Sequence, residues 1–96
     1  PKLKMIAELL KKYPRYRVII EGHTDDIGSD ESNLKISSDR AHNILGYLVK
    51  AGEIPLERLS SVGYGKSRPI APNTDEAGRK QNRRADIVIL TAPILP

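Results

Sequence analysis

The stretch Arg17-Val-Ile-Ile-Glu21 is a compact run dominated by β-branched residues, and it predicts a buried strand from about Tyr16 to Glu21. The polar segment Gly22–Gly28 follows this strand and is expected to form a loop. Ser29 then precedes two acidic residues, which is typical of a helix start because the dipole of the first turn favours acids. A buried strand, a polar loop and a helix therefore form the centre of the predicted fold.

Apolar residues at helical spacing predict one helix on each side of this strand. Upstream, leucine and isoleucine recur through residues 3–10 until Tyr13-Pro14 ends the pattern. Downstream, the helix that follows the loop is expected to end at Gly52 and to turn one apolar face toward the strand. We expect Val18 and Ile20, together with Ile87 and Ile89 near the end of the chain, to be buried against that face. The face consists of Leu34, Ala41, Leu45 and Leu48.

The second half of the chain predicts two further strands, and the resulting order is α-β-α-β-α-β. That order favours an α/β two-layer sandwich, in which a small mixed sheet with at least one parallel strand pair packs on helices. The length of 96 residues indicates one domain over 1–96, with a core at about 3–90 and a tail at 91–96. The remaining predicted elements are a connector with one helical turn at 54–59, a strand at Ser60–Tyr64, an ordered loop at Ser67–Asn73, a helix capped by Asn73 or Thr74 and ending near Asn82, and a strand at Ala85–Leu90.

The composition excludes several classes of protein. No apolar run approaches the roughly 20 residues of a spanning helix, so a membrane connection is expected only through segments outside this chain. The absence of cysteine excludes disulfides and thiol catalysis. The net charge of +4 can suit an acidic polymer or a carboxylate-bearing ligand. The chain has four tyrosines and no Phe or Trp, and the aromatic residues among basic ones are limited to Tyr13 and Tyr16 beside Arg15 and Arg17, which does not favour binding of single-stranded nucleic acid.

None of the sequences that resemble catalytic or metal-binding motifs is complete. Asp25 and Asp26 are adjacent, and such carboxylates usually diverge rather than converge on one bond. Gly65-Lys66-Ser67 matches the last three residues of a phosphate-binding loop motif, but Ser60 occupies the position where that motif needs its first glycine. His23 and His42 have no third metal ligand at a useful spacing. We therefore predict that the chain is not an enzyme and holds no cofactor or metal.

A polar constellation remains around the loop that follows the first strand. Asp25 lies just past the strand end, while Asn33, Ser37 and Arg40 share a stripe of the next helix. If Asp25 and Arg40 converge, they offer an acceptor for an ammonium and a planar fork for a carboxylate, which suits a zwitterionic amino-acid centre. The alternative is a surface salt bridge between the two that contributes under about 1 kcal/mol.

Nine short motifs occur in one order between about Ile6 and Leu90, and together they resemble the OmpA-like peptidoglycan-binding domain. This family includes the OmpA C-terminal domain, the lipoprotein Pal and the flagellar stator protein MotB. Each motif is weak alone, and the resemblance depends on all nine in register. The motifs are Gly22-His-Thr-Asp25, Asn33-Leu-Lys-Ile-Ser37, Arg40-Ala41, Tyr47-Leu48, Val62-Gly-Tyr-Gly65, Arg68-Pro69, Asn73, Gly78-Arg79 and Asn82-Arg83-Arg84.

The resemblance implies a periplasmic domain that grips the stem peptide of peptidoglycan without a covalent bond. In the family the recognised group is diaminopimelate, and the positions that bind it correspond to Asp25 and Arg40. Asn33 matches a further hydrogen-bonding position, and Thr24 belongs to the same motif as Asp25. Arg83 is a further candidate contact, with a purely structural role as its alternative. The implied role is to anchor an envelope protein of the outer membrane to the cell wall.

Two departures from the family pattern set further expectations. Family members begin with a strand before the first helix, whereas this chain begins at the helix, so the sheet is expected to lack that strand. An unpaired edge would favour self-association, and we expect a homodimer. The short loop lacks the longer insertion and tryptophan of many stator proteins, which favours the OmpA or Pal type. A stator domain held at the inner membrane and a basic nucleic-acid or general interaction module stay open as alternatives.

Overall fold

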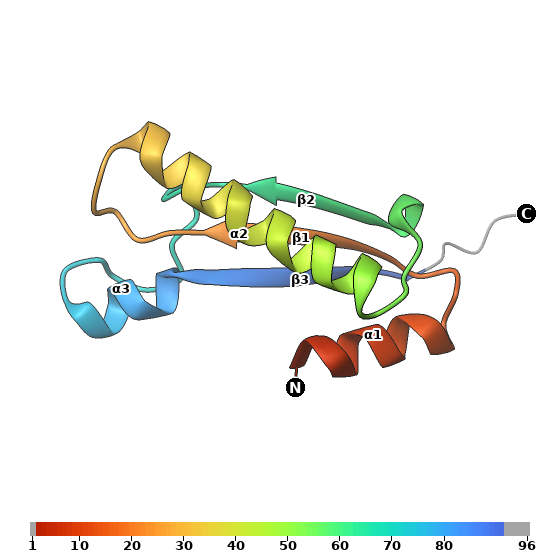
Figure 1. The fold of residues 1–96 in the computed structure, drawn as a ribbon. Coiled ribbons are helices and arrows are strands. Elements are labelled where there is room, and N and C mark those ends of the chain that lie inside the picture. Colours follow the sequence, from red (N-terminus) through yellow and green to blue (C-terminus); the bar gives the residue numbers. More distant parts are fainter. Residues whose placement is uncertain (1, 92–96) are drawn as a thin grey trace, which may run out of the picture.

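The computed structural model describes residues 2–91 and contains the predicted alternation of helices and strands (Figure 1). The predicted tail lies outside the described residues except for Thr91. Within residues 2–91, no helix combines the length and the apolar character that crossing a bilayer demands. The elements are α1 (Lys2–Lys12), β1 (Arg17–His23), α2 (Asp30–Lys50), the short 3₁₀ turn η1 (Leu56–Arg58), β2 (Leu59–Gly63), α3 (Glu76–Asn82) and β3 (Arg84–Leu90).

The three strands form one mixed sheet in the order β2-β1-β3. β1 and β2 are parallel, with Val18 opposite Leu59. β1 and β3 are antiparallel, with Ile20 opposite Ile87. Helix α2 crosses one face of the sheet, mainly over β1 and β2, and α1 packs toward the end of the sheet away from α3 (Figure 1). This arrangement confirms the predicted small mixed sheet packed on helices.

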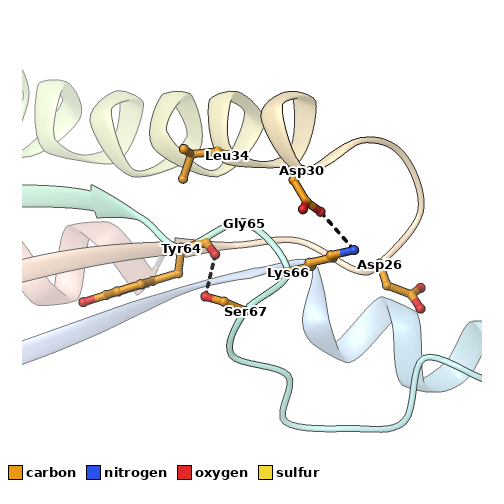
Figure 2. Close-up of a pocket in the computed structure, with 7 residues that line it drawn as sticks. All are labelled: Asp26, Asp30, Leu34, Tyr64, Gly65, Lys66 and Ser67. Carbon is orange, nitrogen blue, oxygen red and sulfur yellow. Dashed lines mark hydrogen bonds and ion pairs between the residues drawn. The ribbon is translucent and has the colours of Figure 1, made fainter.

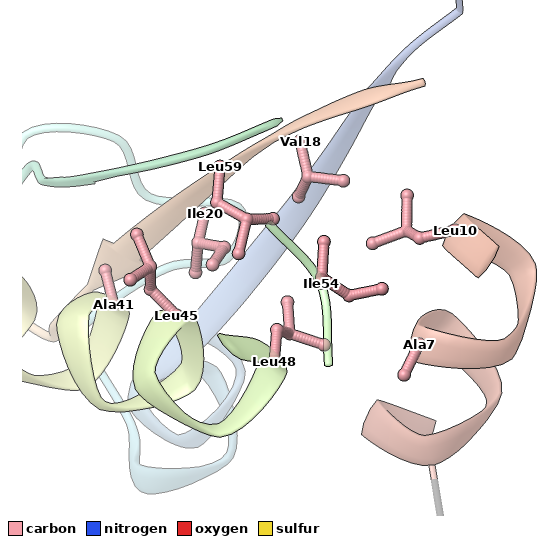
Figure 3. Close-up of a cluster of buried hydrophobic side chains, with 9 residues drawn as sticks. All are labelled: Ala7, Leu10, Val18, Ile20, Ala41, Leu45, Leu48, Ile54 and Leu59. Atoms are coloured by element: carbon pink, nitrogen blue, oxygen red, sulfur yellow. The ribbon is translucent and has the colours of Figure 1, made fainter. Parts of the chain in front are cut away.

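The apolar core lies between the sheet, α2 and α1 (Figure 3). Val18 and Ile20 are buried as predicted, and Leu10 of α1 is fully buried at the far end of the same cluster. Ile87 and Ile89, which were also expected to be buried, are only half-buried, because α2 covers β1 and β2 more than β3. The core residues are Ala7, Leu10, Val18, Ile20, Ala41, Leu45, Leu48, Ile54 and Leu59.

The prediction that Leu34 belongs to the core is wrong, since its side chain is 51% exposed. In the first turns of α2 the positions that face the sheet belong to Asn33 and Ser37, which are buried instead. The reason is the close approach of this part of the helix to the sheet. A Cβ atom on Gly22 would overlap the carbonyl oxygen of Ser37, so only small or compact side chains fit between the two elements.

Strand β1 runs two residues further than the sequence predicted. The predicted polar loop begins at Gly22. In the structure, Gly22 instead pairs with Gly63 of β2 and with Ala85 of β3, and His23 pairs with Arg84 of β3. The missing side chain of glycine lets the strand continue beneath α2. The loop is therefore confined to 24–29, and its first residues are fixed directly to the sheet.

The cap of helix α3 also differs from the prediction. Asp75 is the N-cap, and its Oδ1 accepts a hydrogen bond of 2.8 Å from the backbone N–H of Gly78. Asn73, one of the two predicted caps, instead accepts a 2.8 Å hydrogen bond from the side chain of Asn82. Asn82 is fully buried and also bonds the backbone of residues 70 and 71, so it anchors the long loop before α3.

A pair of glycine substitutions tests the contact between α2 and the sheet. Gly22→Ala should destabilise the fold by about 3 kcal/mol, because the new methyl group meets helix backbone that cannot move aside. Gly46 lies in α2, and a methyl group there would face open space. Gly46→Ala should therefore stabilise the fold by about 0.5–1 kcal/mol through helix propensity. Thermal unfolding followed by circular dichroism measures both. Equal melting temperatures for Gly22→Ala and the parent would contradict the close approach.

The edges of the sheet provide a test of self-association. Between residues 2 and 91, β2 and β3 are the outer strands, and each leaves one row of backbone groups without a strand partner. Such an edge can pair with a second copy of the chain. Sedimentation equilibrium over a concentration series should therefore show a homodimer at high protein concentration. A strictly monomeric profile up to millimolar protein would count against this expectation.

Candidate functional site

A small cavity lies at the carboxyl end of β1, beside the loop at 24–29. Ligands of open α/β sheets commonly bind outside the carboxyl ends of parallel strands, and β1 and β2 both end here. The cavity has a volume of about 180 Å³. All five residues that the sequence singled out line it, although their role in binding stays a prediction. Its lining is Thr24, Asp25, Ile27, Asn33, Ile36, Arg40 and Arg83.

Asp25 is the most buried charged group of the cavity, with only 8% of its surface exposed. Its Oδ1 accepts a 3.0 Å hydrogen bond from the backbone N–H of Ile27, which closes a local turn. Its Oδ2 accepts a 2.8 Å hydrogen bond from Nη1 of Arg83. The bond from Arg83 and the bond from Ile27 hold the pKa of Asp25 below its ordinary value of 3.8, so the carboxylate is ionised at neutral pH.

Arg83 joins two carboxylates that lie far apart in the sequence. Its Nη2 donates a 2.5 Å hydrogen bond to Oε2 of Glu76, while Nη1 bonds Asp25. The bond to Glu76 and then the bond to Asp25 raise the pKa of Arg83, and the same guanidinium lowers the pKa of Glu76. Glu76 was not predicted from the sequence as a partner of Arg83. Its spacing of two helical turns before Arg83 is the signal that could have found it.

Arg40 lines the same cavity but does not form the ion pair with Asp25 that the alternative interpretation required. Its Nη1 donates a 2.6 Å hydrogen bond to the backbone carbonyl of His23. Among the described residues this is the one hydrogen bond of the Arg40 side chain, so other N–H groups of the fork are open to a ligand. The structure thus places Asp25 and Arg40 on one cavity and gives Asp25 a different cationic partner, Arg83.

Thr24 and Asn33 hold the backbone of the loop in place. The hydroxyl of Thr24 donates a 2.8 Å hydrogen bond to the carbonyl of Asp25, and Nδ2 of Asn33 donates to the same carbonyl at 3.4 Å. The backbone N–H of Thr24 donates to the carbonyl of Gly65 at 2.9 Å. Ser37, predicted on the same stripe, lies outside the cavity lining, and its hydroxyl accepts a 2.9 Å bond from the N–H of Gly65.

A second, larger hollow of about 460 Å³ lies between the start of α2 and the segment that follows β2 (Figure 2). Lys66 spans it and forms a 2.9 Å ion pair with Asp30, which raises the pKa of Lys66. The exposed side chain of Leu34 forms part of its wall. Because Lys66 is engaged by an acid and no helix follows directly, the segment Gly65–Ser67 does not form a phosphate-binding loop.

The first cavity combines charges of both signs with apolar walls. Arg40 and Arg83 contribute positive charge, Asp25 contributes negative charge, and Ile27 and Ile36 supply exposed apolar surface. A small ligand that carries an ammonium and a carboxylate on one carbon matches this distribution, because each charge meets an opposite one. The arrangement suits recognition, since no nucleophile and base lie within hydrogen-bond reach of each other in the cavity lining.

Comparison with known proteins gives consistent matches over most of the chain. A sequence model described as the OmpA family matches residues 1–83. Outer membrane porin F of Pseudomonas fluorescens is 46% identical over 84 residues, which are 88% of this chain and 26% of that porin. The chain therefore spans about a quarter of the length of this curated relative.

Two solved structures share the fold. The crystal structure of the peptidoglycan-associated lipoprotein from Burkholderia pseudomallei matches with a TM-score of 0.87 at 35% identity, over 92% of this chain and 74% of that one. The C-terminal domain of Helicobacter pylori MotB matches with a TM-score of 0.85 at 30% identity, over 94% of this chain and 70% of that one.

The ionised state of Asp25 predicts a pH dependence of stability. Since the folded-state pKa of Asp25 lies below 3.8, its stabilising contribution is complete above that value and is lost as the pH falls through the lower, folded-state value. Asp25→Asn should therefore be less stable than the parent at neutral pH, and the difference should shrink below about pH 3.8. Urea unfolding at several pH values measures it. Asp39→Asn, which removes an exposed helix charge, is the control and should show little difference.

Proposed function

Because the chain belongs to the OmpA family, we propose that it binds peptidoglycan non-covalently and anchors an envelope protein to the cell wall from the periplasm. The observation that carries this proposal is the cavity in which Asp25, Arg40 and Arg83 meet beside two apolar side chains. The similarity to a peptidoglycan-associated lipoprotein supports it, since that protein has the same fold and is 35% identical over the aligned residues. The proposed role is binding and not catalysis.

We propose the diaminopimelate residue of the stem peptide as the recognised group. Its side chain ends in a zwitterionic centre, with an ammonium and a carboxylate on one carbon. Asp25 would accept the ammonium, because an ionised carboxylate offers about four lone-pair sites and the described contacts use only two. Arg40 would bind the carboxylate through the N–H groups that its bond to the carbonyl of His23 leaves open.

Arg83, Asn33 and Thr24 have supporting roles in this proposal. Arg83 fixes the orientation of the Asp25 carboxylate and adds positive charge beside the bound carboxylate. Asn33 and Thr24 both donate to the carbonyl of Asp25, which sets the height of the loop above the strand end. The five side chains would therefore act together: Asp25 and Arg40 contact opposite charges of the ligand, while the other three hold Asp25 and its loop in place.

The membrane to which the parent protein is attached is a separate question, with two candidates. Similarity to outer membrane porin F supports attachment to the outer membrane, and we propose this assignment. The TM-score of 0.85 to a MotB domain supports the second candidate, a stator held at the inner membrane. The sequence that precedes the domain in the full protein decides between them, because a single transmembrane helix there would indicate the stator type.

Substitution of Arg40 tests the proposed site. Arg40→Ala should weaken binding of a diaminopimelate stem peptide by about 2–3 kcal/mol, because the ligand carboxylate loses its charged partner. Arg40→Lys should restore only part of this, since an ammonium cannot reproduce the fork. Calorimetric titration gives the affinities, and Arg15→Ala, an exposed arginine on the turn after α1, is the matched control. Equal affinity of the parent and Arg40→Ala would contradict the assignment.

The ligand itself provides a second arm of the same experiment. A lysine-type stem peptide lacks the second carboxylate and should bind the parent less tightly, while the difference should vanish in Arg40→Ala. A salt series separates this site from general binding to nucleic acid, because phosphate-driven binding falls steeply with salt. Tight, strongly salt-dependent binding of nucleic acid together with no peptide binding would favour the interaction-module alternative.

A further inference from the structure

Three potential metal ligands gather on the face of the sheet opposite α2. Glu21 and His23 are two residues apart on β1 and therefore point to the same face, and Asp86 of β3 lies directly opposite Glu21. Nε2 of His23 lies 3.4 Å from Oδ2 of Asp86 and 4.0 Å from Oε1 of Glu21. One ligand atom from each residue lies within 4.8 Å of the other two.

His23 is buried at this cluster without a conventional partner. The residue is only 1% exposed, and among the described residues neither ring nitrogen makes a hydrogen bond. The ring of Tyr64 stacks on the imidazole at 5.5 Å between centroids, and the guanidinium of Arg68 lies over Tyr64 at 3.7 Å. Buried polar nitrogens are rarely left unbonded, so this imidazole, aimed at two carboxylates, points to a ligand.

The sequence predicts no metal site, but the pairing of β1 with β3 brings Asp86 to the two side chains of β1, and we propose that Glu21, His23 and Asp86 bind one Zn²⁺ ion. Zinc in proteins takes nitrogen and carboxylate ligands at about 2.0–2.2 Å, and in a tetrahedral site this separates ligand atoms by roughly 3.4 Å. The separation between His23 and Asp86 already has that value, and the 4.0 Å between His23 and Glu21 would have to shorten by about 0.6 Å. Three protein ligands leave the fourth position to water.

Neighbouring cations set the expected strength of the site. Nε of Arg84 donates to both oxygens of Asp86, at 3.1 and 3.2 Å, and Arg68 lies beyond Tyr64. Their charge opposes that of the metal, so we expect weaker binding than in a structural zinc site. Arg84 also orients the Asp86 carboxylate, as an outer partner of a metal ligand commonly does.

The proposed ion would lie behind the peptide cavity and would tie β1 to β3. The carbonyl of His23 accepts the hydrogen bond of Arg40, so the residue that would bind the metal on one face positions a cavity arginine on the other. Bound Zn²⁺ would link the two strands and should raise the melting temperature, because a ligand that binds only the folded state stabilises it. The metal site stands on its own ligands and does not depend on peptide binding.

Zinc titration of the described domain tests the proposal. Calorimetry with ZnCl₂ in a non-chelating buffer should give one binding site per chain. Asp86→Asn and Glu21→Gln should each weaken it at least about tenfold, because an amide is a poor ligand for zinc. His42→Gln and Asp39→Asn are matched controls outside the cluster and should bind as the parent does.

Nitrogen NMR of the histidine rings gives an independent measurement on the unmodified protein. Addition of Zn²⁺ should shift the Nε2 resonance of His23 and leave His42 unchanged. Unaltered affinity in both Asp86→Asn and Glu21→Gln, loss of binding in His42→Gln, or a His23 resonance that does not move would each overturn the proposal. Circular dichroism of every variant confirms that a loss of binding is not a loss of fold.

Discussion

The contact between the first turns of α2 and the end of β1 is the constraint on which the rest of the structure depends. Gly22 has no side chain, so the backbone of Ser37 lies directly against the strand. The hydroxyl of Ser37 accepts the N–H of Gly65, and the carbonyl of Gly65 accepts the N–H of Thr24. One small region therefore joins the ends of both parallel strands to the helix, and Asp25 begins its loop from that fixed point.

The two halves of α2 contact the rest of the protein in different ways. Its C-terminal half carries Leu45 and Leu48, which pack with β1 and α1 and supply much of the apolar burial (Figure 3). Its N-terminal half presents Asn33 and Ser37 to the sheet, and these stabilise through hydrogen bonds rather than apolar area. The fold thus places its stable core at one end and a polar, well-bonded recognition site at the other.

The local sequence predicted the elements well and the partners of charged groups poorly. Alternation identified Val18 and Ile20, and nearly every element was found to within two residues, because these signals are local. Leu34 was misplaced because helical periodicity carries no information about a glycine in the facing strand. The five predicted polar residues line the cavity, but its apolar residues Ile27 and Ile36 were not predicted. The choice of Arg83 over Arg40 as the partner of Asp25 depends on where α3 ends, which no local pattern contains.

The two arginines at the junction of α3 and β3 reach opposite faces of the sheet. Arg83, the C-cap of α3, bonds Asp25 at the cavity, while Arg84, the first residue of β3, bonds Asp86 on the other face. The alternation of side chains along β1 places His23 on the same face as Asp86, yet the backbone carbonyl of His23 accepts a hydrogen bond from Arg40. The backbone of these strand ends therefore links the two polar clusters. Because sheet hydrogen bonds hold that backbone, the fork of Arg40 is positioned by the sheet itself and not by a neighbouring side chain.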